Sequence, residues 1–138
     1  MFVVDTNVLS ELGRPAPDSN AIGWLKRQDG SLYLPTVVIA ELMFGVERMV
    51  DGRRKVALRA LYSGLFSRLS SNVLPLGPDE AFAVGLLRAQ AEAVGRPMSL
   101  GDAQVAATAR CLGAAVATRN TSDYETTGLD LVNPFDAE

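Results

Sequence analysis

Short apolar runs alternate along the chain with longer segments whose apolar residues recur every three or four positions. The short runs predict buried β-strands at 2–4, 32–34, 73–76, 114–118 and 129–132. The periodic segments predict helices at 19–27, 36–50, 58–69, 78–94 and 99–112, with a further short helix beginning near residue 7. Because strands alternate with helices, we expect a parallel sheet covered by helices on both faces.

Two of the predicted helices carry long apolar stripes. Apolar residues recur at helical spacing from Ile39 to Val50 and again from Leu58 to Leu69. These stripes predict a pair of antiparallel helices that pack into the core rather than against a partner. No repeat, low-complexity tract or linker divides the chain. The interpretation is a single domain over residues 1–138, folded as a three-layer α/β/α sandwich with a mainly parallel central sheet.

The composition narrows the chemistry that such a fold can perform. The chain has 138 residues, 48% of them hydrophobic, with no histidine and one cysteine, Cys111. A chain of this length buries about 68–70% of its unfolded surface, so it needs no disulfide to hold a core. Without histidine, a zinc site, a Ser-His-Asp triad and a Cys-His pair all lack their parts. A bound metal would therefore be a hard, oxygen-loving ion such as magnesium, manganese or calcium.

The same composition indicates a cytoplasmic protein without a membrane partner. The longest uncharged apolar stretch, 32–40, is much shorter than the roughly 20 residues that span a bilayer, and the first residues lack the basic start of a signal peptide. A single cysteine suits a reducing compartment. A net charge of −3 argues against a nucleic-acid binder held by bulk charge, although it leaves room for a local basic rim.

Four acidic residues stand where an α/β sheet places its ligand site. Asp5 follows the first strand, Glu41 lies in the helix after the second, Asp102 begins the helix before the fourth, and Asp123 comes shortly after the fourth. Ligands bind beyond the carboxyl ends of parallel strands. We therefore expect all four to face one pocket.

Each acid also has a purely structural interpretation. Asp5 has the position of a helix cap, and Ser99 and Asp102 have the spacing of a capping box. Asp123 lies in a polar run that is typical of a turn, and Glu41 lies on the side of its helix away from the apolar stripe. Taken singly, none of the four requires a catalytic role.

Taken together, the four acids favour a metal site. Carboxylates that converge at one mouth raise one another's pKa unless a cation neutralises them. A hard divalent ion held in this way polarises a phosphoryl oxygen and lowers the pKa of bound water, which supplies the nucleophile that a chain without histidine lacks. Magnesium-dependent hydrolysis of phosphodiester bonds fits the residues available.

The motifs that carry these acids resemble those of a known family. They are Val3-Val4-Asp5-Thr6-Asn7, Ala40-Glu41-Leu42, Asp102-Ala103-Gln104-Val105-Ala106-Ala107 and Ala117-Thr118-Arg119-Asn120. In this order and spacing they are similar to the PIN-domain ribonucleases, and most of all to the VapC and FitB-like toxins of bacterial type II toxin–antitoxin systems. The resemblance runs from residue 2 to the terminal Asn133-Pro134-Phe135.

The resemblance implies a magnesium-dependent endoribonuclease, with manganese able to substitute, that hydrolyses RNA with metal-activated water. It also implies an α/β/α fold, a homodimer, and inhibition by a small cognate antitoxin whose segment docks on the helical region. Operator DNA is expected to be bound only through the antitoxin.

The family's metal-binding carboxylates match Asp5, Glu41 and Asp102 in this sequence. Its fourth position is less regular, and relatives place an acid either where this chain has Asn120 or where it has Asp123. We take Asp123 as the fourth catalytic and metal-binding residue and Asn120 as a polar helper.

Three further residues are candidates for a role beside the metal or the substrate. Thr6 and Thr118 match hydroxyl positions whose alternative role is to cap a helix or end a strand, and Arg119 is able to meet a phosphate, an acid or only solvent. Basic residues elsewhere offer a rim for RNA. They are Arg14, Lys26, Arg27, Arg48, Arg53, Arg54, Lys55 and Arg96.

Two other function classes remain as alternatives. A PIN-like binding module that has lost cleavage keeps the same fold and the same acids. A phospho-accepting receiver domain also gathers acids around magnesium, but it requires an aspartate after the third strand and a lysine near the fifth. Here the third strand runs into Leu76-Gly77-Pro78, and no lysine follows Lys55.

Overall fold

The computed structural model describes residues 1–137, and within them five strands form one sheet in which every pairing is parallel. The strands lie in the order β3-β2-β1-β4-β5. Their bounds are β1 Phe2–Val4, β2 Leu32–Pro35, β3 Val73–Leu74, β4 Ala115–Ala117 and β5 Leu131–Val132. Receiver-type sheets follow the order 2-1-3-4-5. The observed order therefore excludes the receiver alternative.

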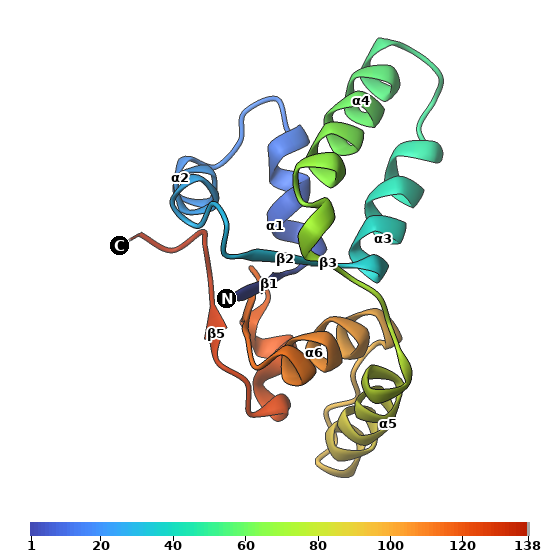
Figure 1. Cartoon of the computed structure of the whole chain (residues 1–138), viewed down its shortest axis with the longest axis vertical. Helices are drawn as coiled ribbons and strands as arrows, with labels where there is room; N and C mark the ends of the chain where they lie inside the picture. Colours follow the sequence, from blue (N-terminus) through green and yellow to red (C-terminus); the bar gives the residue numbers. More distant parts are fainter. Residues whose placement is uncertain (138) are drawn as a thin grey trace.

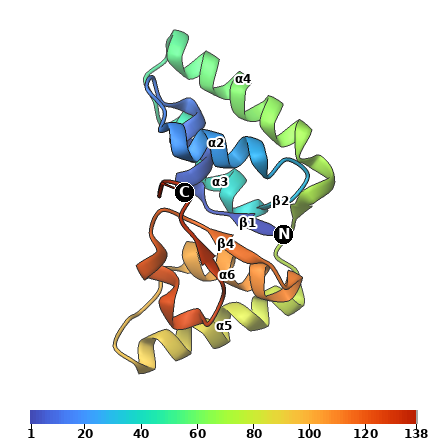
Figure 2. The same ribbon diagram turned by 90° about the vertical axis from the view of Figure 1, so that its left-hand side faces the viewer.

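Helices cover both faces of this sheet, as the sequence predicts. Figure 1 shows α1, α3 and α4 above the strands and α5 and α6 below them, and Figure 2 gives the same separation after a quarter turn. The helices are α1 Thr6–Ser10, α2 Ser19–Arg27, α3 Thr36–Glu47, α4 Arg53–Arg68, α5 Pro78–Ala93 and α6 Leu100–Leu112. Three short 3₁₀ helices complete the described chain: η1 Glu11–Gly13, η2 Ser70–Asn72 and η3 Thr121–Thr127. The α/β/α sandwich is confirmed.

The most deeply buried helix is α6, and its small residues explain why. Ala103, Ala106 and Ala107 are fully buried, as is Val105, because side chains of this size let the helix lie close against β1. As the crossover helix that leads into the parallel strand β4, α6 runs antiparallel to the sheet. Its N-terminus therefore lies at the edge where the strands end.

Two predicted core positions are wrong. Val50 is 90% exposed because α3 ends at Glu47, which leaves Val50 in the connection to α4. Leu61 is 40% exposed because α4 packs mainly against α3 and lies at the outside of the molecule, so that of its residues only Tyr62 is buried. The rest of the predicted stripe does pack against the core, with Tyr62 buried and Leu58, Leu65, Phe66 and Leu69 partly buried.

Local structure also differs from the prediction at the sheet edge. The segment after β4, expected to be a turn, forms the 3₁₀ helix η3. The third and fifth strands are both shorter than predicted. In β3 the cause is Pro75, which ends the strand after two residues. No helix among residues 1–137 has the length and apolar character needed to cross a membrane.

Candidate active site

Asp5 lies at the carboxyl end of β1 and is held there by four donors. Its Oδ1 accepts the N–H of Thr6 at 2.8 Å, which caps α1. Its Oδ2 accepts from Thr118 Oγ1 at 2.8 Å, Asn7 Nδ2 at 3.2 Å and the Tyr124 hydroxyl at 3.1 Å. Only 6% of Asp5 is exposed. The capping role and the site role of Asp5 are therefore compatible, because they use different oxygens.

Asp102 faces Asp5 from the N-terminus of α6. Its backbone N–H donates to Ser99 Oγ at 3.1 Å, which confirms the predicted cap. Its Oδ1 lies 3.3 Å from the same Tyr124 hydroxyl that contacts Asp5. Burial, and after it the negative charge of Asp5, raise the pKa of the Asp102 carboxyl above its ordinary value. The two carboxylates thus share one neighbour and repel each other.

The residue that joins the two acids, Tyr124, is one that sequence reasoning missed. It lies in η3, is 1% exposed, and points its hydroxyl between Asp5 and Asp102. Burial, followed by the two carboxylates, raises its pKa far above that of an ordinary tyrosine, so the phenol stays neutral. The available signal was a lone aromatic residue within the polar stretch 118–127.

Glu41 approaches from the opposite side of the site. It is exposed on α3, and its Oε2 accepts from Thr6 Oγ1 at 2.8 Å. Its Oε1 lies against the backbone of Gly101, where an added Cβ would be only 2.8 Å away. Because Thr6 follows Asp5 and Gly101 precedes Asp102, these contacts place Glu41 beside both of the other acids.

Asp123 and Asn120 occupy different places near this group. Asp123 is exposed on η3 and lines a polar pocket of about 380 Å³ together with Asp102, whose pKa its charge also raises. Asn120 is exposed, and its backbone N–H donates to Thr118 Oγ1 at 3.1 Å. Asp123 as the fourth ligand stays a prediction, with Asn120 at the edge.

Comparison with known proteins gives this arrangement a family. The family model described as PIN domain matches residues 2–128. The chain belongs to the PIN domain family. It is 38% identical over 138 residues to the VapC ribonuclease Y4jK of Sinorhizobium fredii, covering 99% of each chain, and 30% identical to toxin FitB of Neisseria gonorrhoeae, covering 98% of this chain and 99% of the other.

Solved structures agree with the family match. A structure of FitAB bound to an IR36 DNA fragment superposes with a TM-score of 0.93 at 28% sequence identity, covering 100% of this chain and 98% of the other. FitAcB from Neisseria gonorrhoeae gives a TM-score of 0.93 at 29% identity, covering 99% of this chain and 100% of the other. The PIN domain described here therefore resembles toxin subunits of toxin–antitoxin complexes over their whole length.

The oxygen-only donor set of this PIN domain suits a hard divalent cation. Among residues 1–137 no three acidic or thiol side chains stand close enough, as placed, to hold an ion. Asp5 and Asp102 both contact the Tyr124 hydroxyl. The exposed carboxylate of Glu41, which accepts from Thr6, would have to turn toward them to join a shared ion. A cation at this point would counteract the burial and the repulsion by Asp5 that together raise the pKa of Asp102.

Arg119 has its side chain directed away from the acids. Its guanidinium lies 4.6 Å from the ring centroid of Phe135, near the C-terminus. Its backbone N–H donates to Asn7 Oδ1 at 3.0 Å, which orients the Asn7 amide toward Asp5. The structure thus gives Arg119 a role through its backbone, while the phosphate contact stays a prediction.

Arg96 is the member of the predicted basic rim that lines the pocket beside Asp102. Its guanidinium donates to Glu125 Oε2 at 2.9 Å and to the Ser122 carbonyl at 2.8 Å, which fixes it at the pocket mouth. Lys55, in the densest predicted cluster, instead donates to Asp51 Oδ1 at 3.0 Å in the connection between α3 and α4. Of these two cations, only Arg96 lies beside Asp102.

Proposed function

We propose that this PIN domain is a magnesium- or manganese-dependent endoribonuclease and the toxin of a type II toxin–antitoxin module. The observation that carries the proposal is the meeting of Asp5 and Asp102 on one buried hydroxyl, with Glu41 beside them, at the carboxyl edge of a parallel sheet. A divalent cation bound between such carboxylates would offset their mutual repulsion.

The residues divide the work between binding and orientation. Asp5, Asp102 and Glu41 would hold the cation, with Asp123 at the open side. Such an ion supplies electrostatic activation of a phosphodiester and of the attacking water. Thr118 fixes the buried oxygen of Asp5, while Arg96 at the pocket mouth would bind a phosphate of the RNA backbone.

The relatives support a nuclease that acts on RNA. Besides the VapC ribonuclease Y4jK, the chain is 29% identical to the tRNA(fMet)-specific endonuclease VapC of Shigella flexneri, covering 92% of each chain. RNA as substrate and an antitoxin as partner would both place this protein in the cytoplasm.

A groove beside the active site suits the antitoxin. A cavity of about 260 Å³ lies among α1, α3 and α4, and Glu41, Gly45 and Tyr62 are among its lining residues. Gly45 leaves the surface of α3 open at this point, since nothing lies within 4 Å of where its Cβ would be. An antitoxin segment bound here would cover Glu41 and block the site, and the antitoxin would supply the contacts to operator DNA.

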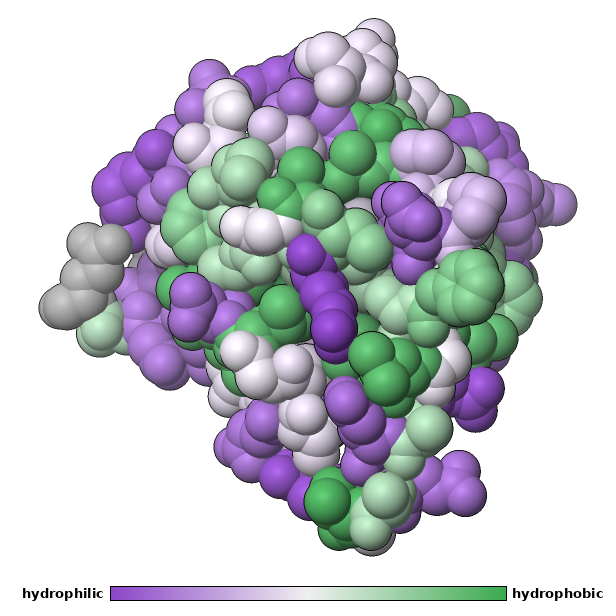
Figure 3. Space-filling model, turned by 60° about the horizontal axis from the view of Figure 1, so that its bottom comes forward, coloured by the Kyte–Doolittle hydropathy of each residue, from purple (hydrophilic) through white to green (hydrophobic). Residues whose placement is uncertain are grey.

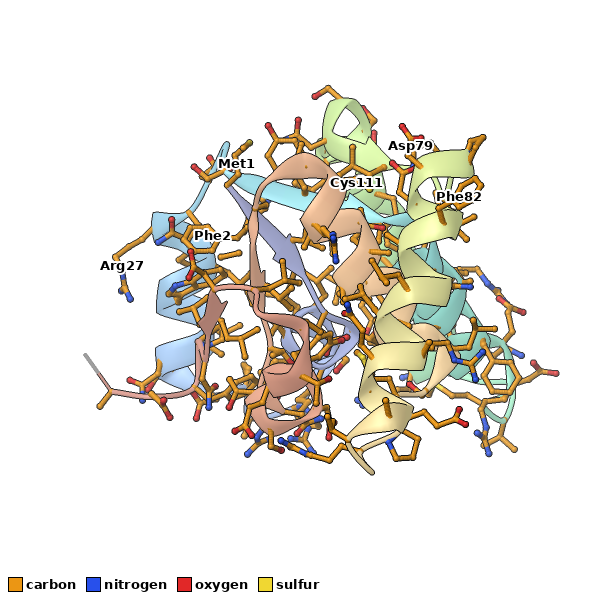
Figure 4. All side chains as sticks on the ribbon, turned by 90° about the horizontal axis from the view of Figure 1, so that it is seen from below. Met1, Phe2, Arg27, Asp79, Phe82 and Cys111 are labelled. Carbon is orange, nitrogen blue, oxygen red and sulfur yellow. The ribbon has the colours of Figure 1, made fainter. Side chains whose placement is uncertain are left out.

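Exposed apolar side chains support a homodimer. On and beside α5, Leu76, Phe82 and Leu86 are 40%, 84% and 43% exposed, and Phe44 on α3 is 66% exposed. Figure 3 shows apolar residues gathered on the face that α5 and α6 form, and Figure 4 shows Phe82 projecting away from α5. Surfaces of this kind are typical of protein interfaces.

The test is cleavage of RNA by the chain purified free of antitoxin. We expect products with Mg²⁺ or Mn²⁺, none with EDTA, and loss of cleavage in Asp5→Ala and Asp102→Ala, while Asp130→Ala, an exposed acid outside the site, cleaves like the wild type. Cleavage by both folded site variants would refute the assignment. Tight RNA binding without any metal-dependent product would instead favour the catalytically silent binding module.

A further inference from the structure

Tyr124 is the largest fully buried side chain of the chain's described part, yet its polar end faces the two acids of the site. A buried phenol usually finds a hydrogen-bond partner, and one backbone carbonyl is enough to provide it. Here the hydroxyl is placed at 3.1 Å from Asp5 and 3.3 Å from Asp102, on two separate elements of the fold. The Tyr124 hydroxyl thus links Asp5, which follows β1, to Asp102, which lies on α6.

The helix that carries Tyr124 is fixed on both sides of it. Arg96 donates to the Ser122 carbonyl at 2.8 Å and to Glu125 Oε2 at 2.9 Å. The Thr127 hydroxyl donates to the Tyr124 carbonyl at 2.6 Å. The hydroxyl of Tyr124 therefore has a defined position, set by η3 rather than by the acids it contacts.

The two acids depend on this hydroxyl to different extents. Asp5 keeps three other donors, from Thr6, Asn7 and Thr118. The contact of Asp102 with Tyr124 is what ties its carboxylate to Asp5 across the site. Loss of the hydroxyl would leave Asp5 in place. Asp102 would keep its contact with Ser99 on its own helix but would lose the group that links it to Asp5, while their mutual repulsion remained.

We infer that the Tyr124 hydroxyl is a positioning group that holds the Asp5 and Asp102 carboxylates at the separation a small divalent cation requires. This inference rests on the proposed metal-dependent function and adds to it a residue that touches neither ion nor substrate. Groups that hydrogen-bond to ligating carboxylates commonly change metal affinity by about 10- to 100-fold.

Ion size provides a test that separates positioning from a general structural role. Mg²⁺ demands near-ideal octahedral geometry at about 2.0–2.1 Å, whereas Ca²⁺ accepts flexible geometry at about 2.3–2.6 Å. In Tyr124→Phe, which keeps the ring and removes only the hydroxyl, we expect the Kd for Mg²⁺ to rise about tenfold and the Kd for Ca²⁺ to rise less than about threefold. Calorimetric titration of the purified chain measures both constants without reference to cleavage.

The control is Tyr33→Phe, the same deletion at a half-buried tyrosine on β2, which should leave both constants unchanged. An unchanged Mg²⁺ constant in Tyr124→Phe, or equal weakening of both ions, would overturn the inference. Failure of the wild type to bind either ion would overturn the proposed function itself, so the two failures are distinguishable.

A second measurement uses the wild-type chain alone, should Tyr124→Phe fold poorly. The chain has three tyrosines, and the ring carbon that bears each hydroxyl gives a separate carbon-13 resonance. Titration with Mg²⁺ should shift the resonance of Tyr124, because its hydrogen-bond acceptors become ligands, and leave that of Tyr33 in place. A Tyr124 resonance that does not respond while the ion binds would overturn the inference.

Discussion

The backbone of Gly101 lies directly against the carboxylate of Glu41, so that a Cβ on Gly101 would stand 2.8 Å from Oε1. Gly101→Ala should therefore displace the end of a flexible side chain and leave the backbone alone. Since alanine is favoured over glycine in helices by up to about 1 kcal/mol, we expect the free energy of unfolding to stay equal or rise. Affinity for Mn²⁺ should fall, because Glu41 is pushed from its place beside Asp102.

Gly85→Ala on α5 is the matched control. Nothing lies within 4 Å of the Cβ position of Gly85, which lies in the middle of α5, so this variant should gain at least as much helical preference as Gly101→Ala without a change in Mn²⁺ affinity. Urea unfolding and calorimetric titration measure the two properties separately. Equal Mn²⁺ affinity in Gly101→Ala and Gly85→Ala would show that Glu41 does not take part in binding.

Thr118→Val tests the polar floor of the site. The Thr118 hydroxyl is fully buried, donates to Asp5 at 2.8 Å and accepts the Asn120 N–H at 3.1 Å, so its removal takes one of four donors from the buried Asp5 carboxylate and the acceptor from the Asn120 N–H. We expect a loss of about 1–3 kcal/mol in the free energy of unfolding, together with weaker metal binding. Urea denaturation measures the change in the free energy of unfolding.

Thr108→Val is the control for this loss. The Thr108 hydroxyl is also buried, but it donates to the Gln104 carbonyl within α6, a contact that contributes little to a helix. The same substitution there should cost less than about 1 kcal/mol. Equal costs at both positions would mean that Thr118 stabilises the fold only as any buried threonine does.

The pH dependence of stability follows from the raised pKa of Asp102. Burial and the charge of Asp5 disfavour its ionised form in the folded chain, whereas in the unfolded chain it ionises near 3.8. The folded state therefore holds more protons between that value and the raised one, so the contribution of Asp102 to stability falls as pH rises through this window. In EDTA, the free energy of unfolding of the wild type, measured relative to Asp102→Asn, should therefore fall as pH rises through this window.

The affinity of the site for a divalent cation should change with pH in the opposite direction to this stability contribution. Because a cation binds the ionised carboxylate, the affinity for the cation should fall as pH drops below the raised pKa of Asp102, where protons compete for the carboxylate. Titrations with Mn²⁺ across this window test the expectation. A stability difference between wild type and Asp102→Asn that does not vary with pH would contradict the assigned shift.

The parallel sheet and the acids at its edge were predictable because both depend on local pattern. A run such as Phe2 to Val4 followed by Asp5 indicates a buried strand and what ends it, and the rule for parallel strands then brings Asp102 to the same edge. The resemblance of the surrounding motifs added the family, which the match over residues 2–128 confirms.

Tyr124 and Val50 show what local pattern does not specify. The polar residues around Tyr124 favour a turn, and only tertiary packing decides that its ring enters the core beneath Asp5 and Asp102. Val50 continues a helical stripe, yet the helix ends at Glu47 before reaching it. The burial of Tyr124 and the exposure of Val50 both depend on how elements distant in sequence pack together, which hydrophobic periodicity does not predict.

The guanidinium of Arg96 is expected to contribute a phosphate contact to RNA binding. It lines the pocket that contains Asp102 and is held at the mouth by Glu125. RNA binding is measured in the cleavage-deficient Asp5→Ala background. There, Arg96→Ala should weaken binding and should reduce the magnitude of the slope of log K against log salt concentration by about 0.7, the value for one phosphate contact to a single strand. Arg88→Ala, an exposed arginine on α5, should leave the slope unchanged. A slope that is the same in both variants would assign the RNA path to another part of the surface, since a lost phosphate contact always releases fewer counterions.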